Sequence, residues 1–156
     1  MDKTNYMQLA IKLANKAAKN GDIPVGAVIV CNGKIVGQGY NKKEKNKNAL
    51  LHAEIIAINQ ASKKLKDYRL ENCELYVTFE PCLMCVGAIL SARIKKVYFG
   101  AFDNRFGACK LLSENNFNHV AEYEGGVLEA ECSSLLTSFF KNLRKNKEQK
   151  RKNNNN

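Results

Sequence analysis

Two short motifs, separated by a full helix and strand's worth of chain, most constrain how this sequence can fold. The first is His52-Ala53-Glu54 and the second is Pro81-Cys82-x-x-Cys85. Imidazole nitrogen and thiolate sulfur are preferred zinc ligands, and three protein ligands leave a fourth tetrahedral position open. A fold that uses both motifs at one ion must therefore bring two distant segments together, in the pattern of a catalytic rather than a structural zinc site.

The spacing of the two cysteines favours a metal site at the start of a helix. Residues three apart share one helix face, so Cys82 and Cys85 can reach one ion. Pro81 suits the first helical turn, where free N–H groups also stabilise thiolates. A Cys-x-x-Cys alone also fits a redox pair or half of a four-cysteine site. No second close cysteine pair exists in the chain, and the motif does not lie near its start.

Glu54 is a carboxylate that such a metal centre does not need as a ligand. Two thiolates and a neutral imidazole balance the charge of Zn²⁺, and zinc can lower the pKa of a bound water from 15.7 to about 7. A nearby carboxylate can then move the proton of that water. We therefore predict that His52, Cys82 and Cys85 hold one zinc ion and that Glu54 passes the water proton to a departing nitrogen.

Hydrophobic periodicity predicts an α/β protein. Helices are expected at 4–20, 51–65, 81–92 and 129–147. Strands are expected at 25–31 and 34–40, joined across Asn32-Gly33, and at 74–79, 96–100 and 119–123. Helices that connect strands imply a partly parallel sheet with helices on both faces. The prediction is one domain over residues 1–146 with a mixed sheet of about five strands.

Charge is concentrated at the end of the chain. Of a net charge of +10 over 156 residues, residues 141–156 carry +6 from seven basic residues and one acid. A polyanion such as nucleic acid is one expected partner, and a merely solvated tail is the equal alternative. Residues 147–156 are expected to be disordered. No stretch is apolar enough to span a membrane and the start is a poor signal peptide, so a cytoplasmic protein with six reduced cysteines is expected.

From about residue 5 to 145 the sequence resembles bacterial tRNA-specific adenosine deaminases, within the zinc-dependent cytidine and deoxycytidylate deaminase superfamily. The matching stretches are Pro24-Val25-Gly26-Ala27, Gly39-Tyr40-Asn41, His52-Ala53-Glu54, Tyr68-Arg69-Leu70, Leu75-Tyr76-Val77-Thr78, Glu80-Pro81-Cys82, Met84-Cys85, Phe99-Gly100-Ala101, Asp103 and Phe139-Phe140. The His-x-Glu and Pro-Cys-x-x-Cys pair is the general signature of zinc nucleobase deaminases. The remaining stretches narrow the resemblance to this branch.

The resemblance implies a three-layer α/β/α cytidine deaminase-like fold and a homodimer with one zinc per subunit. It implies hydrolytic conversion of adenosine to inosine at the wobble position of a tRNA anticodon, with an arginine tRNA as the expected substrate. It assigns zinc binding to His52, Cys82 and Cys85 and proton transfer to Glu54. The residues it places at the substrate are Asn41, Ala53, Pro81 and Asp103. Without the resemblance, Asn41 reads equally as a turn residue.

Other residues are candidates for RNA contact or depart from the family pattern. The candidates are Phe102, Arg105, Phe106, Phe140, Arg144 and Lys145. Phe102 and Phe106 replace polar residues, and either stacking on splayed bases or packing inside the loop fits them. Residues 48–51 also depart from the family, which affects the pocket wall more than the zinc chemistry.

Two other functions fit the same motifs. A deaminase of free guanine, cytosine or nucleosides needs the same four residues, but it has no use for a basic tail. A non-catalytic RNA-binding protein is the second alternative, against which Glu54 argues, because a structural zinc site needs no spare carboxylate. His119, the other histidine, is expected to be structural or on the surface.

Overall fold

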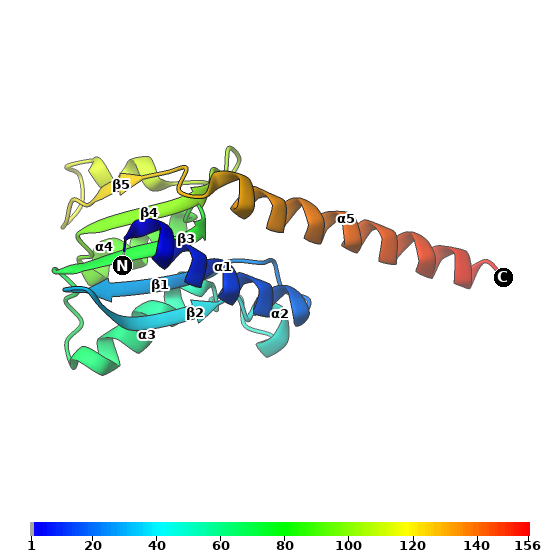
Figure 1. The fold of residues 1–156 in the computed structure, drawn as a ribbon, viewed down its shortest axis with the longest axis horizontal. Helices are drawn as coiled ribbons and strands as arrows, with labels where there is room; N and C mark the ends of the chain where they lie inside the picture. The colour runs from blue at the N-terminus through cyan, green and yellow to red at the C-terminus, as the bar shows by residue number, and fades with distance from the viewer. Residues whose placement is uncertain (1) are drawn as a thin grey trace.

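A mixed five-stranded sheet forms the middle layer of the protein, which is described over residues 2–156 by a computed structural model (Figure 1). Its strands are β1 (Gly26–Cys31), β2 (Lys34–Tyr40), β3 (Cys73–Phe79), β4 (Lys96–Ala101) and β5 (Glu122–Glu124). Their order across the sheet is β2-β1-β3-β4-β5. β1 pairs antiparallel with β2 and β3, whereas β3–β4 and β4–β5 are parallel. The predicted mixed sheet is confirmed.

Helices cover both faces of the sheet. α1 (Lys3–Lys19) and the first part of α5 (Glu129–Asn154) pack on one face, and α3 (Ala53–Leu65) and α4 (Leu83–Ala92) lie on the other. Each interface has its own apolar core, one around Met7, Val28 and Cys132 and the other around Ile29, Leu75 and Ile89. The three-layer α/β/α architecture expected from the sequence is therefore confirmed.

Small side chains let α3 approach the sheet closely. Ala53, Ala57 and Ala61 form one fully buried stripe at helical spacing. They face β2, where a Cβ atom at Gly39 would overlap the carbonyl oxygen of Ala53. The absence of a side chain at Gly39 thus sets the depth of the α3 N-terminus, which carries His52 and Glu54.

The Asn32-Gly33 turn also has the predicted geometry. Asn32 has φ 50° and Gly33 has φ 80°, the left-handed pair that a two-residue hairpin turn requires. Because asparagine and glycine tolerate this conformation, the β1–β2 hairpin is fixed by local sequence.

Several element boundaries differ from the sequence prediction. α4 begins at Leu83, so Pro81 precedes the helix instead of lying in its first turn. The strand predicted at 119–123 is displaced to Glu122–Glu124, and the His119 ring nitrogen Nε2 lies 2.9 Å from the Ile94 carbonyl oxygen. Two short helical segments, α2 (Lys43–Asn46) and the 3₁₀ turn η1 (Cys109–Ser113), have no apolar periodicity that would predict them.

α5 is longer than its apolar pattern indicates. Its apolar residues end at Leu143, but the helix continues to Asn154 and projects away from the three layers (Figure 1). Residues 147–154, expected to be part of a disordered tail, are helical in the structure. Lysine, arginine and glutamine have good helix propensity, which accounts for helix beyond the packed part. Within residues 2–156, no helix combines the length and the apolar character needed to cross a membrane.

Candidate active site

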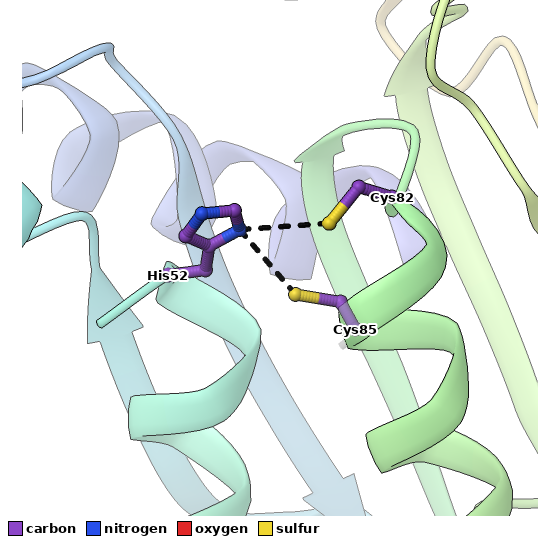
Figure 2. A group of neighbouring side chains, drawn as sticks. All are labelled: His52, Cys82 and Cys85. Atoms are coloured by element: carbon purple, nitrogen blue, oxygen red, sulfur yellow. Dashed lines mark hydrogen bonds between the residues drawn. The ribbon is translucent and has the colours of Figure 1, made fainter. Parts of the chain in front are cut away.

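The three predicted ligands meet at the ends of two helices. Nδ1 of His52 lies 3.7 Å from Sγ of Cys82 and 3.6 Å from Sγ of Cys85 (Figure 2). All three candidate donor atoms lie within 4.8 Å of one another. His52 comes from the start of α3, and both cysteines come from the start of α4. The long-range contact implied by the two motifs is therefore present.

Capping positions place two of these ligands. His52 is the residue that precedes α3, and Cys82 is the residue that precedes α4; both have extended backbone conformations. An extended residue at the helix start turns its side chain away from the helix body. Cys85 follows one turn later on α4 and is completely buried. The helix N-termini add partial positive charge that favours thiolates here.

The donor set fits zinc. Tetrahedral zinc with a Zn–S bond of about 2.3 Å and a Zn–N bond of about 2.0–2.1 Å separates sulfur from nitrogen by about 3.6 Å. The two observed sulfur–nitrogen distances, 3.6 and 3.7 Å, match this value. Two sulfurs and one imidazole leave one coordination position for water or substrate. These residues can therefore hold one zinc ion in an open site.

Electrostatics at the site favour a thiolate. Hydrogen bonds from Cys85 and His52 lower the pKa of Cys82 to about 3. The hydrogen bond with Cys82 in turn raises the pKa of His52. Thiolate is the form of cysteine that binds metal, so Cys82 is available as a ligand. The pKa of Cys85 is raised, first by its hydrogen bond with Cys82 and then by burial, so metal binding must displace the proton of this thiol.

Glu54 lies beside the ligands in a buried position. Only 4% of its surface is exposed, and burial raises the pKa of its carboxyl group above the usual range. The charge on Cys82 raises this pKa further, whereas that on His52 lowers it. A carboxyl group with a raised pKa can both accept and return a proton, as acid–base catalysis near neutral pH requires.

A large cavity opens in front of these residues. Its volume is about 980 Å³, and it is open on one side to solvent. The residues that line it come from the metal-binding helices, the segment between α1 and β1, α2, the end of β3, the segment after β4, and α5. The predicted site residues among them are Asn41, His52, Glu54, Cys82, Asp103, Phe106 and Phe140.

Asn41 connects the cavity wall to the α3 N-terminus. Its Oδ1 accepts a hydrogen bond of 2.8 Å from the Ala53 N–H, and its Nδ2 donates to the Ile23 carbonyl at 3.1 Å. These partners fix the orientation of the amide. One N–H and one oxygen lone pair of Asn41 remain for a substrate, and the Ala53 N–H is already used.

Asp103 closes a turn at the cavity rim. Its Oδ1 accepts hydrogen bonds from the N–H groups of Arg105 and Phe106, both at 3.0 Å. Such a turn shapes the backbone of the loop. Among residues 2–156, no group donates a hydrogen bond to the second carboxylate oxygen of Asp103, a residue that lines the cavity.

The remaining predicted residues lie away from the cavity lining. Ala53 and Pro81 are buried, and the Pro81 carbonyl accepts from Ala108. Phe102 packs edge-on against Phe99 at 5.0 Å, although half of its surface is exposed. The last three are exposed beside or beyond the cavity: Arg105, Arg144 and Lys145.

Sequence reasoning missed two acids that shape the cavity. Asp22, only 2% exposed, accepts from the N–H groups of Glu44 at 2.8 Å and Lys45 at 3.2 Å and so anchors α2. Glu80 accepts from backbone groups of the loop after β4. Neither bond has a local sequence pattern, because each joins residues more than 20 positions apart.

The chain is similar to known deaminases in sequence. Residues 1–101 match the model of the cytidine and deoxycytidylate deaminase zinc-binding region. A tRNA-specific adenosine deaminase of Bacillus subtilis is 48% identical over 153 residues, covering 95% of this chain and 94% of that protein. The tRNA-specific adenosine deaminase of Aquifex aeolicus is 42% identical over 150 residues, covering 94% and 99%.

Solved structures show the same fold. One, from work on A-to-I editing by tRNA:A34 deaminases at the wobble position, has a TM-score of 0.82 and 35% identity, and covers 85% of this chain and 99% of that one. A guanine deaminase from Bacillus subtilis has a TM-score of 0.64 and 33% identity, covering 80% and 85%. The curated relatives and the structure with the higher TM-score are both tRNA deaminases, which supports adenosine in tRNA over a free base.

Proposed function

We infer that this chain, which belongs to the zinc-dependent cytidine and deoxycytidylate deaminase family and within it to the tRNA-specific adenosine deaminases, converts adenosine to inosine at the wobble position of a tRNA anticodon. The observation that carries this proposal is the open His52–Cys82–Cys85 site with buried Glu54 at the base of the cavity. The names and the close likeness of the relatives support the substrate.

The reaction replaces the amino group on C6 of adenine with oxygen from water. When bound, zinc supplies a water that is acidic enough to react near neutral pH. Glu54 takes one proton from this water and delivers it to the departing nitrogen, so that ammonia leaves; the second water proton ends on N1 of the base, which gives the inosine carbonyl at C6. Because Glu54 is buried, the proton stays at the reacting atoms instead of exchanging with solvent.

Asn41 and the rim hold the base. The free N–H and lone pair of Asn41 suit one edge of a purine. The exposed ring of Phe106, with the Arg105 guanidinium 4.9 Å from its centre, offers a stacking surface for a base of a single-stranded loop. Phe140 on α5 also lines the cavity, and Arg144 and Lys145 follow it toward the basic end of the helix. These features fit an anticodon loop.

A free-base deaminase is the alternative assignment, because a guanine deaminase shares the fold at a similar sequence identity, although with a lower TM-score. Its substrate has no phosphates, whereas the rim here includes Lys43, Lys47 and Lys147. The test is inosine formation by purified protein on an arginine tRNA anticodon stem-loop, beside free adenosine, guanine and cytosine. Conversion of the stem-loop alone supports the proposal, and preference for a free base contradicts it.

We further propose that the protein works as a homodimer in the cytoplasm, where tRNA is modified. The outward face of α4 supports the dimer: Leu83 is 67% exposed, and Gly87 has open space where a side chain would lie. Exposed apolar surface of this kind is typical of an interface. Gly87→Glu should leave the subunit folded but shift the mass measured by light scattering to that of one chain. A dimer that survives this change would place the interface elsewhere.

A further inference from the structure

The loop after β4 forms one side of the cavity and is anchored at both of its ends. Residues 102–109 carry Asp103 and Phe106, which line the cavity. Among residues 2–156, the Asp103 carboxylate and carbonyl bond to residues 105–107 alone. Those local bonds fix the shape of the turn, but they do not fix where the turn lies relative to the metal ligands.

Glu80 makes the long-range connection. Its Oε1 accepts a hydrogen bond of 3.2 Å from the Asp103 N–H, and its Oε2 accepts one of 3.3 Å from the Cys109 N–H. The backbone adds two more bonds, from Glu80 N–H to the Ala101 carbonyl at 2.9 Å and from Ala108 N–H to the Pro81 carbonyl at 3.0 Å. One side chain therefore holds both ends of the loop, two positions before the ligand Cys82.

Gly107 provides an independent sign that this contact is tight. A Cβ atom at Gly107 would overlap the carboxyl carbon and Oε2 of Glu80. The loop backbone thus lies directly against the carboxylate, which leaves no room for any larger residue. The same Cβ atom would also overlap the Asp103 carbonyl oxygen, so Gly107 lies between the Glu80 carboxylate and the turn that Asp103 forms.

We propose that Glu80 is a positioning residue that fixes the substrate-facing loop 102–109 at a set distance from the zinc ligands. The carboxylate does not touch the reacting atoms; it acts through Asp103 and Phe106. A carboxylate suits this task because its two oxygens can accept bonds from both loop ends at once, whereas an amide offers one acceptor oxygen. The role in substrate recognition rests on the proposed function, but the anchoring of the loop does not.

The test uses Glu80→Gln and Gly107→Ala in the full-length zinc-loaded protein. Glu114→Gln is the matched control, since it removes the same charge and its carboxylate accepts no hydrogen bond from any residue in the described range 2–156. Three quantities are measured on each protein: zinc content, amide hydrogen exchange of peptides covering 102–109, and kcat and KM for the stem-loop.

Both test variants should keep one zinc per chain and exchange the amides of Asp103 and Cys109 at least about tenfold faster, the factor that corresponds to removal of one hydrogen bond. KM should rise about tenfold with kcat changed by less than about threefold, and the control should match the parent protein. Unchanged exchange in Glu80→Gln, or zinc loss in proportion to the decrease in activity, would overturn the proposal.

A second comparison separates the two proposals. If the parent protein forms no inosine while exchange in 102–109 still rises in both variants, the substrate assignment fails and the anchoring role stands. If Glu80→Gln does not fold, Glu80→Asp decides the question by the same three readouts, because it keeps the charge but shortens the side chain that reaches the N–H groups of Asp103 and Cys109.

Discussion

The base of the cavity and its rim are built in opposite ways. At the base, His52 and Cys82 precede helices packed on the sheet, and Cys85 and Glu54 are buried. At the rim, loops and α5 present exposed side chains, such as Phe106 at 62% and Phe140 at 39%. The base thus resembles a rigid core, whereas the rim resembles a binding surface.

This difference divides the work of the site. Proton transfer and metal binding need atoms held within a few tenths of an ångström, which helix ends buried against a sheet provide. Recognition of an RNA loop needs wide contacts to bases and phosphates. Changes at the base should therefore abolish the reaction for every substrate, and changes at the rim should alter affinity and leave the chemistry in place.

The largest effect is expected from removing a ligand. Cys85→Ser should lose zinc and lower inosine formation by a factor of about 10³ or more, because the reaction depends on an acidified water. Metal analysis and inosine formation measure the two losses together. Cys31→Ser is the control, since Cys31 lies at the end of β1 outside the site and should keep both. Full zinc content and activity in Cys85→Ser would contradict the assignment of metal binding to the base of the cavity.

Asn41 lies between base and rim, so an intermediate effect is expected. Asn41→Ala removes the bonds to Ala53 and Ile23 and the free amide groups. Removal of hydrogen bonds of ordinary strength predicts a decrease of about 10- to 100-fold in kcat/KM. Zinc content should not change. Asn15→Ala removes a hydrogen bond that an exposed side-chain amide makes within α1, and it should retain parent kinetics. An equal decrease in this control would show that the Asn41 effect is nonspecific.

A smaller effect is expected from the end of α5. Replacing Lys147, Lys150, Arg151 and Lys152 with glutamine keeps the helix but removes four charges. The stem-loop affinity should decrease about tenfold near 0.1 M salt, and the logarithmic salt dependence should become shallower by about 0.7–0.9 for each phosphate that the protein no longer neutralises. Filter binding over a salt series measures the slope. An unchanged slope would mean that this segment is only solvated.

The smallest effect on the reaction is expected from cysteines outside the site, which act on stability alone. Burial raises the pKa of Cys73 and of Cys132 to about 12, from an ordinary value of 9.0. Unfolded thiols lose protons first as the pH rises above about 9, so the free energy of unfolding should decrease from there toward 12, by up to ~1.4 kcal/mol per pH unit for each thiol. Urea unfolding at several pH values measures this. Cys132→Ala should flatten the decrease; a free energy that rises above pH 9 would contradict it.

The base of the cavity was predictable from sequence and the rim was not. Cys-x-x-Cys spacing and a histidine two residues before a glutamate impose their geometry through helix starts, so His52, Glu54, Cys82 and Cys85 converge as predicted. The three-layer fold was also predictable, because apolar periodicity and the Asn32-Gly33 turn determine local structure. The start of α4 was predicted at Pro81, two residues before its observed start at Leu83. Proline is as compatible with the residues before a helix as with its first turn.

The rim depends on contacts between distant parts of the chain. α2 lies in a polar stretch and is held by hydrogen bonds from its backbone to Asp22. The whole β1–β2 hairpin separates Asp22 from α2 along the chain. The short β5 is placed by pairing with β4 and not by its own pattern. Phe102 and Phe106 are alike in sequence, yet one packs on Phe99 and the other lines the cavity. No local pattern separates such outcomes, because the tertiary fold decides them.

The role of Glu54 as the residue that transfers the proton is tested by measuring zinc content and inosine formation on one preparation of Glu54→Gln. The substitution keeps the size of the side chain and removes only its ability to carry the proton. Glu54→Gln should retain one zinc per chain and an unchanged stem-loop affinity, with inosine formation reduced by a factor of about 10³ or more. Activity within about tenfold of the parent protein, with zinc retained, would contradict the role assigned to Glu54.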